Sequence, residues 1–141
     1  MIAFYDRFKF LIVPFIVWTG IQIFKVVYDR VTTKKWHLKR FFGAGGMPSA
    51  HSATIMTITI MIAKKYGIDS PIFALSGIFA FIVMYDAAGV RREVGNQAKV
   101  LNDIIQDHNM TNAKKLQEMT GHTPVQVMMG AIIGFIAGLI G

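Results

Sequence analysis

Four long apolar segments, at about residues 8–28, 48–66, 72–88 and 124–140, constrain this chain more than any other feature. A helix of about 20 apolar residues crosses a bilayer, and only helices or closed barrels satisfy their backbone polar groups there. Hydrophobic residues make up 53% of the 141 residues and charged residues only 16%, against about a quarter in a typical soluble domain. We therefore expect one all-α domain over residues 1–141, a polytopic membrane helical bundle of about four spans.

The segment between the third and fourth spans has a different pattern. Residues 90–107 are mostly polar, yet apolar residues recur at helical spacing along one face, namely Val94, Ala98, Leu101, Ile104 and Ile105. This pattern predicts an amphipathic helix that lies at the membrane interface or folds against the bundle. A short helix at about Ala113–Met119 is expected to follow it.

The fourth span carries a stripe of glycines. Gly130, Gly134 and Gly138 recur every four residues, the pattern of small residues that lets two helix backbones approach closely. The partner helix belongs either to the same chain or to a second copy, so a homodimer through these glycines is one expectation.

The distribution of basic residues predicts an orientation. If each span crosses once, residues 29–49 and 86–123 share one side, which carries ten lysines and arginines: Arg30, Lys34, Lys35, Lys39, Arg40, Arg91, Arg92, Lys99, Lys114 and Lys115. The positive-inside rule makes this side cytoplasmic in a multi-pass protein of the cell membrane. The basic residues behind the net charge of +7 then lie where they can contact anionic membrane lipids. We therefore expect no nucleic-acid partner.

A glycine-rich loop opens the second span and suggests an anion site. Glycines such as Gly46 let a backbone approach a ligand closely, and the N–H groups at a helix start favour a phosphate. Ser49 can donate to a phosphate oxygen, and His51 can act as an acid or base near neutral pH. The alternative is a helix start with a serine cap and an incidental histidine.

A second polar cluster closes the third span. Arg91 and Arg92 offer guanidinium groups that match phosphate oxygens, and Asp86 precedes them. Arg92 and Lys99 share one face if the helix continues. The alternative is a basic anchor to lipid headgroups at a helix end.

A third cluster, Gly121–Pro124, opens the fourth span. Thr123 resembles an N-cap and Pro124 a first helical residue, so His122 lies at another positive helix end and can serve as a nucleophile toward phosphorus. Histidine pairs with metal-ligand spacing are absent. Cysteine is absent as well, which excludes disulfides and cysteine-based metal sites. We therefore expect no metal site.

These three clusters together resemble a known family. The sequences Gly-Gly-Met-Pro-Ser-Ala-His-Ser-Ala, Tyr-Asp-Ala-Ala-Gly-Val-Arg-Arg and Gly-His-Thr-Pro-Val-Gln-Val-Met-Met-Gly are similar to the divergent branch of the type 2 phosphatidic acid phosphatase superfamily. The resemblance implies a helical membrane fold and hydrolysis of phosphate esters through a phosphohistidine, with no metal or cofactor required. It also implies that Ser49 holds phosphate, that His51 protonates the leaving oxygen and that His122 is the nucleophile.

The chain departs from the main pattern of that superfamily in three places. No Lys-x6-Arg-Pro precedes Ser49, and no Ser-Arg stands six residues before His122. The position of the aspartate that orients the nucleophile is Gln126, which cannot stabilise an imidazolium as a carboxylate does. Asp86 is a candidate to replace that aspartate across the bundle, and Arg91 or Arg92 to replace the missing clamps.

The leading expectation is a membrane phosphatase that acts on a lipid phosphate or diphosphate from the cytoplasmic side. The main alternative is a non-catalytic protein that binds anionic lipid headgroups or phosphate. A small transporter or channel subunit is a third reading, although four spans are few for a transporter unless it oligomerises.

Overall fold

The computed structural model describes residues 2–36, 41, 45–108, 110, 113–118 and 120–141. Within these ranges the chain forms five helices and no strand: α1 Ile2–Thr33, α2 Ala50–Tyr66, α3 Pro71–Ala88, α4 Val90–Asp107 and α5 Pro124–Ile140. Each apolar segment expected from the sequence is helical. The basic residues Lys39 and Arg40, which were counted for the orientation, lie outside the described residues.

Local capping explains where the shorter apolar helices begin. The Ser70 hydroxyl accepts from Phe73 N at 3.3 Å, and Pro71 follows as the first residue of α3. Thr123 and Gln126 form a reciprocal capping box before α5. Such caps satisfy the N–H groups that a helix start leaves without an intrahelical partner. The second span begins at Ala50, two residues later than expected, because Ser49 takes the capping position.

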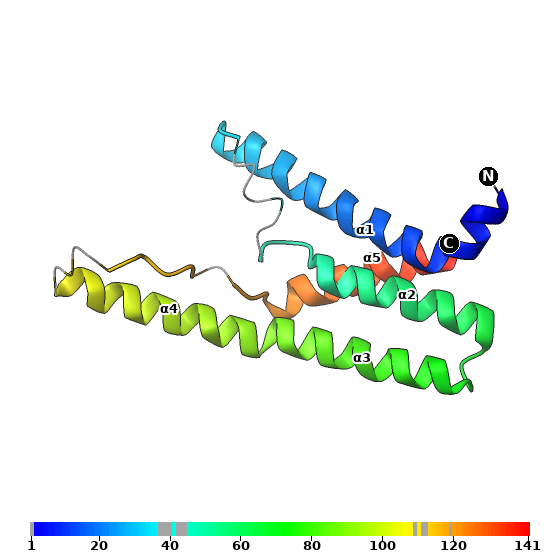
Figure 1. The fold of residues 1–141 in the computed structure, drawn as a ribbon. Coiled ribbons are helices and arrows are strands. Elements are labelled where there is room, and N and C mark those ends of the chain that lie inside the picture. The colour runs from blue at the N-terminus through cyan, green and yellow to red at the C-terminus, as the bar shows by residue number, and fades with distance from the viewer. Residues whose placement is uncertain (1, 37–40, 42–44, 109, 111–112, 119) are drawn as a thin grey trace.

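The helices form a bundle around α2, which packs against α1, α3 and α5. In Figure 1, α2 and α3 run antiparallel, and the N- and C-terminal ends of the chain lie near each other at one end of the bundle. The small core centres on Ile21, Ala50 and Ala53, with Trp18 and Ile133 packed against it. The small side chains of Ala50 and Ala53 let α2 approach α1 and α5 closely.

The glycine stripe of α5 faces α2 of the same chain. A Cβ atom added at Gly130 or Gly134 would collide with the main-chain oxygen of Ser49 or Ala53, and one at Gly138 would lie 2.7 Å from the Thr57 oxygen. The three glycines therefore make their close backbone contact within the chain. They are not free to form the interface of the expected homodimer.

The expected amphipathic helix exists as α4, and its direction is a result that the sequence leaves open. It continues the line of α3 and extends beyond the other helices (Figure 1). The segment that returns toward α5 runs beside it. Residues 113–118 of that segment are not helical, so the short helix expected at Ala113–Met119 is wrong for them; Met119 lies outside the described residues.

A side-chain amide explains the extended segment. Asn102 on α4 donates to the Leu116 carbonyl at 2.9 Å and accepts from the Leu116 N–H at 2.8 Å. It also donates to the Glu118 carboxylate at 2.8 Å. One side-chain amide thus satisfies both main-chain groups of Leu116. The main chain of Leu116 therefore does not need the hydrogen bonds of the helix that was expected over this segment.

The surface of the bundle carries many large apolar side chains, and its largest fully buried side chains are polar. Phe15, Leu75 and Phe81 are about two-thirds exposed, whereas Ser52 and Thr57 have no exposed surface. This distribution is the reverse of a soluble core. Among the described residues, Phe4–Thr33 and Pro71–Asp107 are long and apolar enough to cross a membrane, and Pro124–Ile140 is a shorter apolar helix.

Candidate functional site

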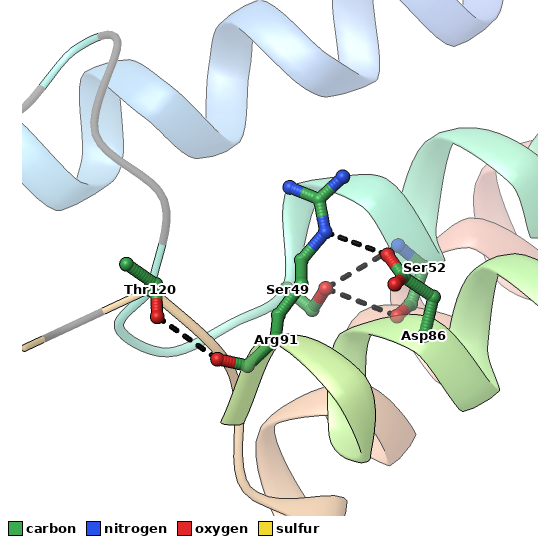
Figure 2. Close-up of polar contacts among 5 residues, drawn as sticks. All are labelled: Ser49, Ser52, Asp86, Arg91 and Thr120. Atoms are coloured by element: carbon green, nitrogen blue, oxygen red, sulfur yellow. Dashed lines mark hydrogen bonds and ion pairs between the residues drawn. The ribbon is translucent and has the colours of Figure 1, made fainter. Parts of the chain in front are cut away.

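The polar clusters of the sequence meet where α2 begins, α3 passes into α4 and α5 begins. Ser49 N donates to the Gln126 carbonyl at 3.0 Å, and His122 N donates to the Ala87 carbonyl at 3.0 Å. The Thr120 hydroxyl donates to the Arg91 carbonyl at 2.9 Å (Figure 2). These bonds fix three chain segments, far apart in sequence, around one site.

Two histidines face each other in this site. The ring centroids of His51, in the first turn of α2, and His122, before α5, are 6.5 Å apart at an interplanar angle of 61°. His122 is 3% exposed, whereas His51 is exposed. The structure therefore brings together the two histidines that the sequence singled out.

Gln126 orients the buried histidine. Its Oε1 atom accepts from Thr123 N at 3.1 Å and lies 3.3 Å from His122 Nδ1. Because the Thr123 N–H is an unambiguous donor, it identifies the oxygen of the Gln126 amide. An amide oxygen only accepts, so we assign the proton of the neutral ring to Nδ1, which leaves the lone pair on Nε2.

The surroundings of His122 favour the neutral ring. Burial lowers the pKa of His122 below its ordinary value of 6.5, and the positive charge of Lys25 lowers it further. Hydrogen bonds with the Gln126 side chain and the Gly46 backbone act in the opposite direction. A neutral imidazole near pH 7 is the form that can act as a nucleophile.

Asp86 pairs with Arg91 and not with His122. The Arg91 Nε atom donates to the Asp86 carboxylate at 2.6 Å (Figure 2), and both side chains are partly exposed. The sequence suggests Asp86 as the group that orients His122 across the bundle. In the structure, Gln126 is the residue beside His122 Nδ1, and Asp86 is paired with Arg91. Asp86 instead fixes the Arg91 guanidinium beside the site.

Ser49 is the N-cap of α2. Its hydroxyl oxygen accepts from Ser52 N at 3.3 Å and from the Ser52 hydroxyl at 3.0 Å (Figure 2). Its exposed fraction is 0%. The structure thus places Ser49 behind the surface of the site, where it supports the helix start.

The remaining residues selected from the sequence differ in position. Gly46 has a φ of 77°, a left-handed conformation that favours glycine, and lies beside His122. Arg92 is exposed, and its backbone packs against Gly121. Lys99 is exposed on α4, about two helical turns beyond Arg91, so the structure does not bring it to the two histidines.

Sequence reasoning missed two residues of α1. Gln22 and Lys25 are each 5% exposed, and Lys25 Nζ donates to the Gly45 carbonyl at 3.0 Å. In the sequence they stand out only as polar interruptions of the first span. Polar groups inside an apolar span are costly and often functional, and this was the signal that could have found them.

An apolar cavity of about 440 Å³ adjoins the site. Side chains of α1, α2 and α3 line it, including Phe10, Trp18, Ile55 and Phe79, and His51 lies in its wall. Among the residues that the structure describes, no group of three or more His, Asp or Glu side chains is placed to hold a metal ion.

Comparison with known proteins gives the family. The sequence pattern of the Divergent PAP2 family matches residues 7–137. The chain belongs to this family. It is also similar to the uncharacterized membrane protein YuiD of Bacillus subtilis (strain 168), with 36% identity over 133 residues and coverage of 84% of each chain. No solved structure matches the chain. Family membership, the apolar helices and the helical fold together confirm the expected all-α membrane bundle.

Proposed function

We propose that this protein is a membrane phosphatase that hydrolyses a lipid phosphate or diphosphate monoester, with His122 as the nucleophile. The observation that carries the proposal is the pairing of His122 with His51, at 6.5 Å between ring centroids. Membership of the Divergent PAP2 family supports it, because the mainstream superfamily that the motifs resemble hydrolyses phosphate esters through a phosphohistidine.

In the first step, His122 Nε2 attacks phosphorus while the bond from phosphorus to the ester oxygen breaks, and His51 gives its proton to that oxygen. In the second step, water attacks the phosphohistidine, His51 takes a proton from the water, and phosphate leaves. A reacting nitrogen lies about 3–3.5 Å from phosphorus, and an acid about 2.6–3.2 Å from the oxygen that it protonates. The ring centroids lie 6.5 Å apart, so we expect both rings to contact one phosphoryl group bound between them.

Positive groups around the histidines can stabilise the phosphoryl group. The first N–H groups of α2 have no intrahelical partner, and the helix dipole favours an anion there. Arg91, held by Asp86 at 2.6 Å, supplies a guanidinium that matches phosphoryl oxygens. Gly46 and Arg92 lie at the edge of this site, whereas Ser49 contributes by capping α2.

The cavity beside His51 supports a lipid substrate over a soluble phosphate ester. It is about 440 Å³ in volume and mostly apolar, which suits a hydrocarbon chain whose phosphate lies at the histidines. The excess of lysine and arginine on the side of the loops supports a cytoplasmic site in a multi-pass protein of the cell membrane.

A second candidate function is binding without turnover. Gln126 is neutral, and an amide stabilises an imidazolium less than a carboxylate does. The same site would then hold an anionic lipid headgroup or phosphate without cleaving it.

Phosphate release from a panel of lipid phosphates, by purified protein with and without chelator, tests the proposal. The variants are His122→Asn and His51→Asn, and His108→Asn at the exposed end of α4 is the matched control. We expect chelator-insensitive release that both site variants lose and the control retains. If the protein binds lipid but releases phosphate from no substrate, the phosphatase proposal is refuted and binding without turnover is supported.

A further inference from the structure

The first helix carries two buried polar side chains whose place in the site needs an explanation. Gln22 and Lys25 are each 5% exposed, and their spacing of three residues puts them on one face of α1. Burial of an amide and an ammonium group among apolar helices is unfavourable unless both groups make polar interactions. Their position therefore indicates a polar partner on this face.

Lys25 reaches the loop that leads into α2, and Gly46 of that loop lies beside His122. Its Nζ atom donates to the Gly45 carbonyl at 3.0 Å, in the loop that leads into the Ser49 cap. Its charge acts on both His122 and His51. An ammonium group has three N–H donors, so Lys25 can hold this loop and a phosphoryl oxygen together.

Gln22 adds a second, independent observation. Its Oε1 atom is buried and has no hydrogen-bond partner among the described residues. A buried acceptor without a donor is unfavourable, and a ligand that carries an O–H group would satisfy it. A role for Lys25 in bracing the loop alone leaves this acceptor unexplained.

We propose that Lys25 and Gln22 form the wall of the site that recognises a monoprotonated phosphoryl group. Lys25 Nζ donates to a non-bridging oxygen, and Gln22 Oε1 accepts from the P–OH group. The inference rests on the proposed function, because it assigns the phosphoryl group to the same site. It also gives the site a cation in place of the clamp motif that the sequence lacks.

This arrangement has a consequence for selectivity. Phosphate near neutral pH carries a proton that it can donate, whereas sulfate of similar size and shape carries none. A buried acceptor is left unpaired when a ligand lacks the matching donor, and such a mismatch discriminates strongly between ligands. Gln22 therefore favours phosphate over sulfate, while Lys25 attracts both anions.

Calorimetry measures the binding of inorganic phosphate and of sulfate to the purified full chain. The two anions test the roles of Lys25 and Gln22 separately. The variants are Gln22→Met, Lys25→Met and Lys25→Arg. The matched control is Lys64→Met, because Lys64 also donates to a main-chain carbonyl, that of Leu139, at the far end of α2. Thermal unfolding of each variant shows whether it folds.

We expect Gln22→Met to weaken phosphate binding about 10-fold and leave sulfate binding unchanged. Lys25→Met should weaken both anions by about 10-fold to 100-fold, Lys25→Arg should restore part of this loss, and Lys64→Met should match the wild type. If Lys25→Met fails to fold, the Gln22→Met and Lys25→Arg variants decide the matter.

Two results would overturn the inference alone: an equal effect of Gln22→Met on phosphate and sulfate, or unchanged phosphate affinity in folded Lys25→Met. Phosphate binding with the expected variant effects, but without release from any lipid phosphate, would overturn hydrolysis and leave the inference intact. A wild-type protein that neither binds phosphate nor releases it would overturn both.

Discussion

A single methyl group on the glycine stripe should separate α2 from α5. A Cβ atom built at Gly134 lies 2.9 Å from the Ala53 carbonyl carbon and Cα, and still closer to the Ala53 oxygen, whereas ordinary contact begins at 3.4 Å. The obstacle is backbone, so no side chain can rotate away. In Gly134→Ala the two helices must therefore move apart by about 0.5 Å or more along this contact.

This displacement has a measurable cost. A gap of about 0.5–1 Å loses a quarter to a half of the dispersion energy between facing atoms, and overpacking typically costs about 1–3 kcal/mol. The gain from replacing a helical glycine by alanine is about 0.5–1 kcal/mol. We expect Gly134→Ala to lower the free energy of unfolding by about 1–2 kcal/mol after this gain is included.

Gly77→Ala is the matched control, because a Cβ atom at Gly77 in α3 meets nothing within 4 Å. Unfolding of both variants in a detergent titration gives the comparison, and Gly77→Ala should equal or exceed the wild type in stability. Phosphate release should also fall in Gly134→Ala, since the shift moves His51 relative to His122. Equal stability of the two variants would refute the close backbone contact.

Two further predictions concern the site, and a third concerns the contact between α4 and residues 113–118. Phosphate release as kcat/KM should decline as the pH falls through the pKa of His122, with a midpoint below 6.5 because burial and Lys25 lower that pKa; Lys25→Met should move the midpoint toward 6.5, and an unmoved midpoint would contradict the role of this charge. Arg91→Lys should raise KM about 10-fold while changing stability by about 0–1 kcal/mol, as measured by kinetics and thermal unfolding; an unchanged KM would remove Arg91 from the site. Asn102→Ala should expose residues 113–118 to proteolysis by freeing both main-chain groups of Leu116, whereas the control Asn96→Ala, on the exposed face of α4, should not.

Local signals in the sequence were sufficient for the helices and for part of the site. The apolar segments, the amphipathic spacing of residues 90–107 and the cap at Thr123 predicted helices close to those observed, because these signals act within one or two turns. The three motifs likewise indicated the family, and they pointed to the two histidines that the fold brings to 6.5 Å.

Tertiary structure alone decided which groups face one another. Gln126 orients His122, while Asp86 pairs with Arg91, because the caps and the α3–α4 junction set their positions. Asn102 holds residues 113–118 extended against a local tendency toward helix. The glycine stripe packs against α2 of the same chain, and α1 brings Lys25 to the Gly45 carbonyl, 20 residues away in the sequence. Burial and long-range contacts select such partners, and no pattern within a single helix encodes them.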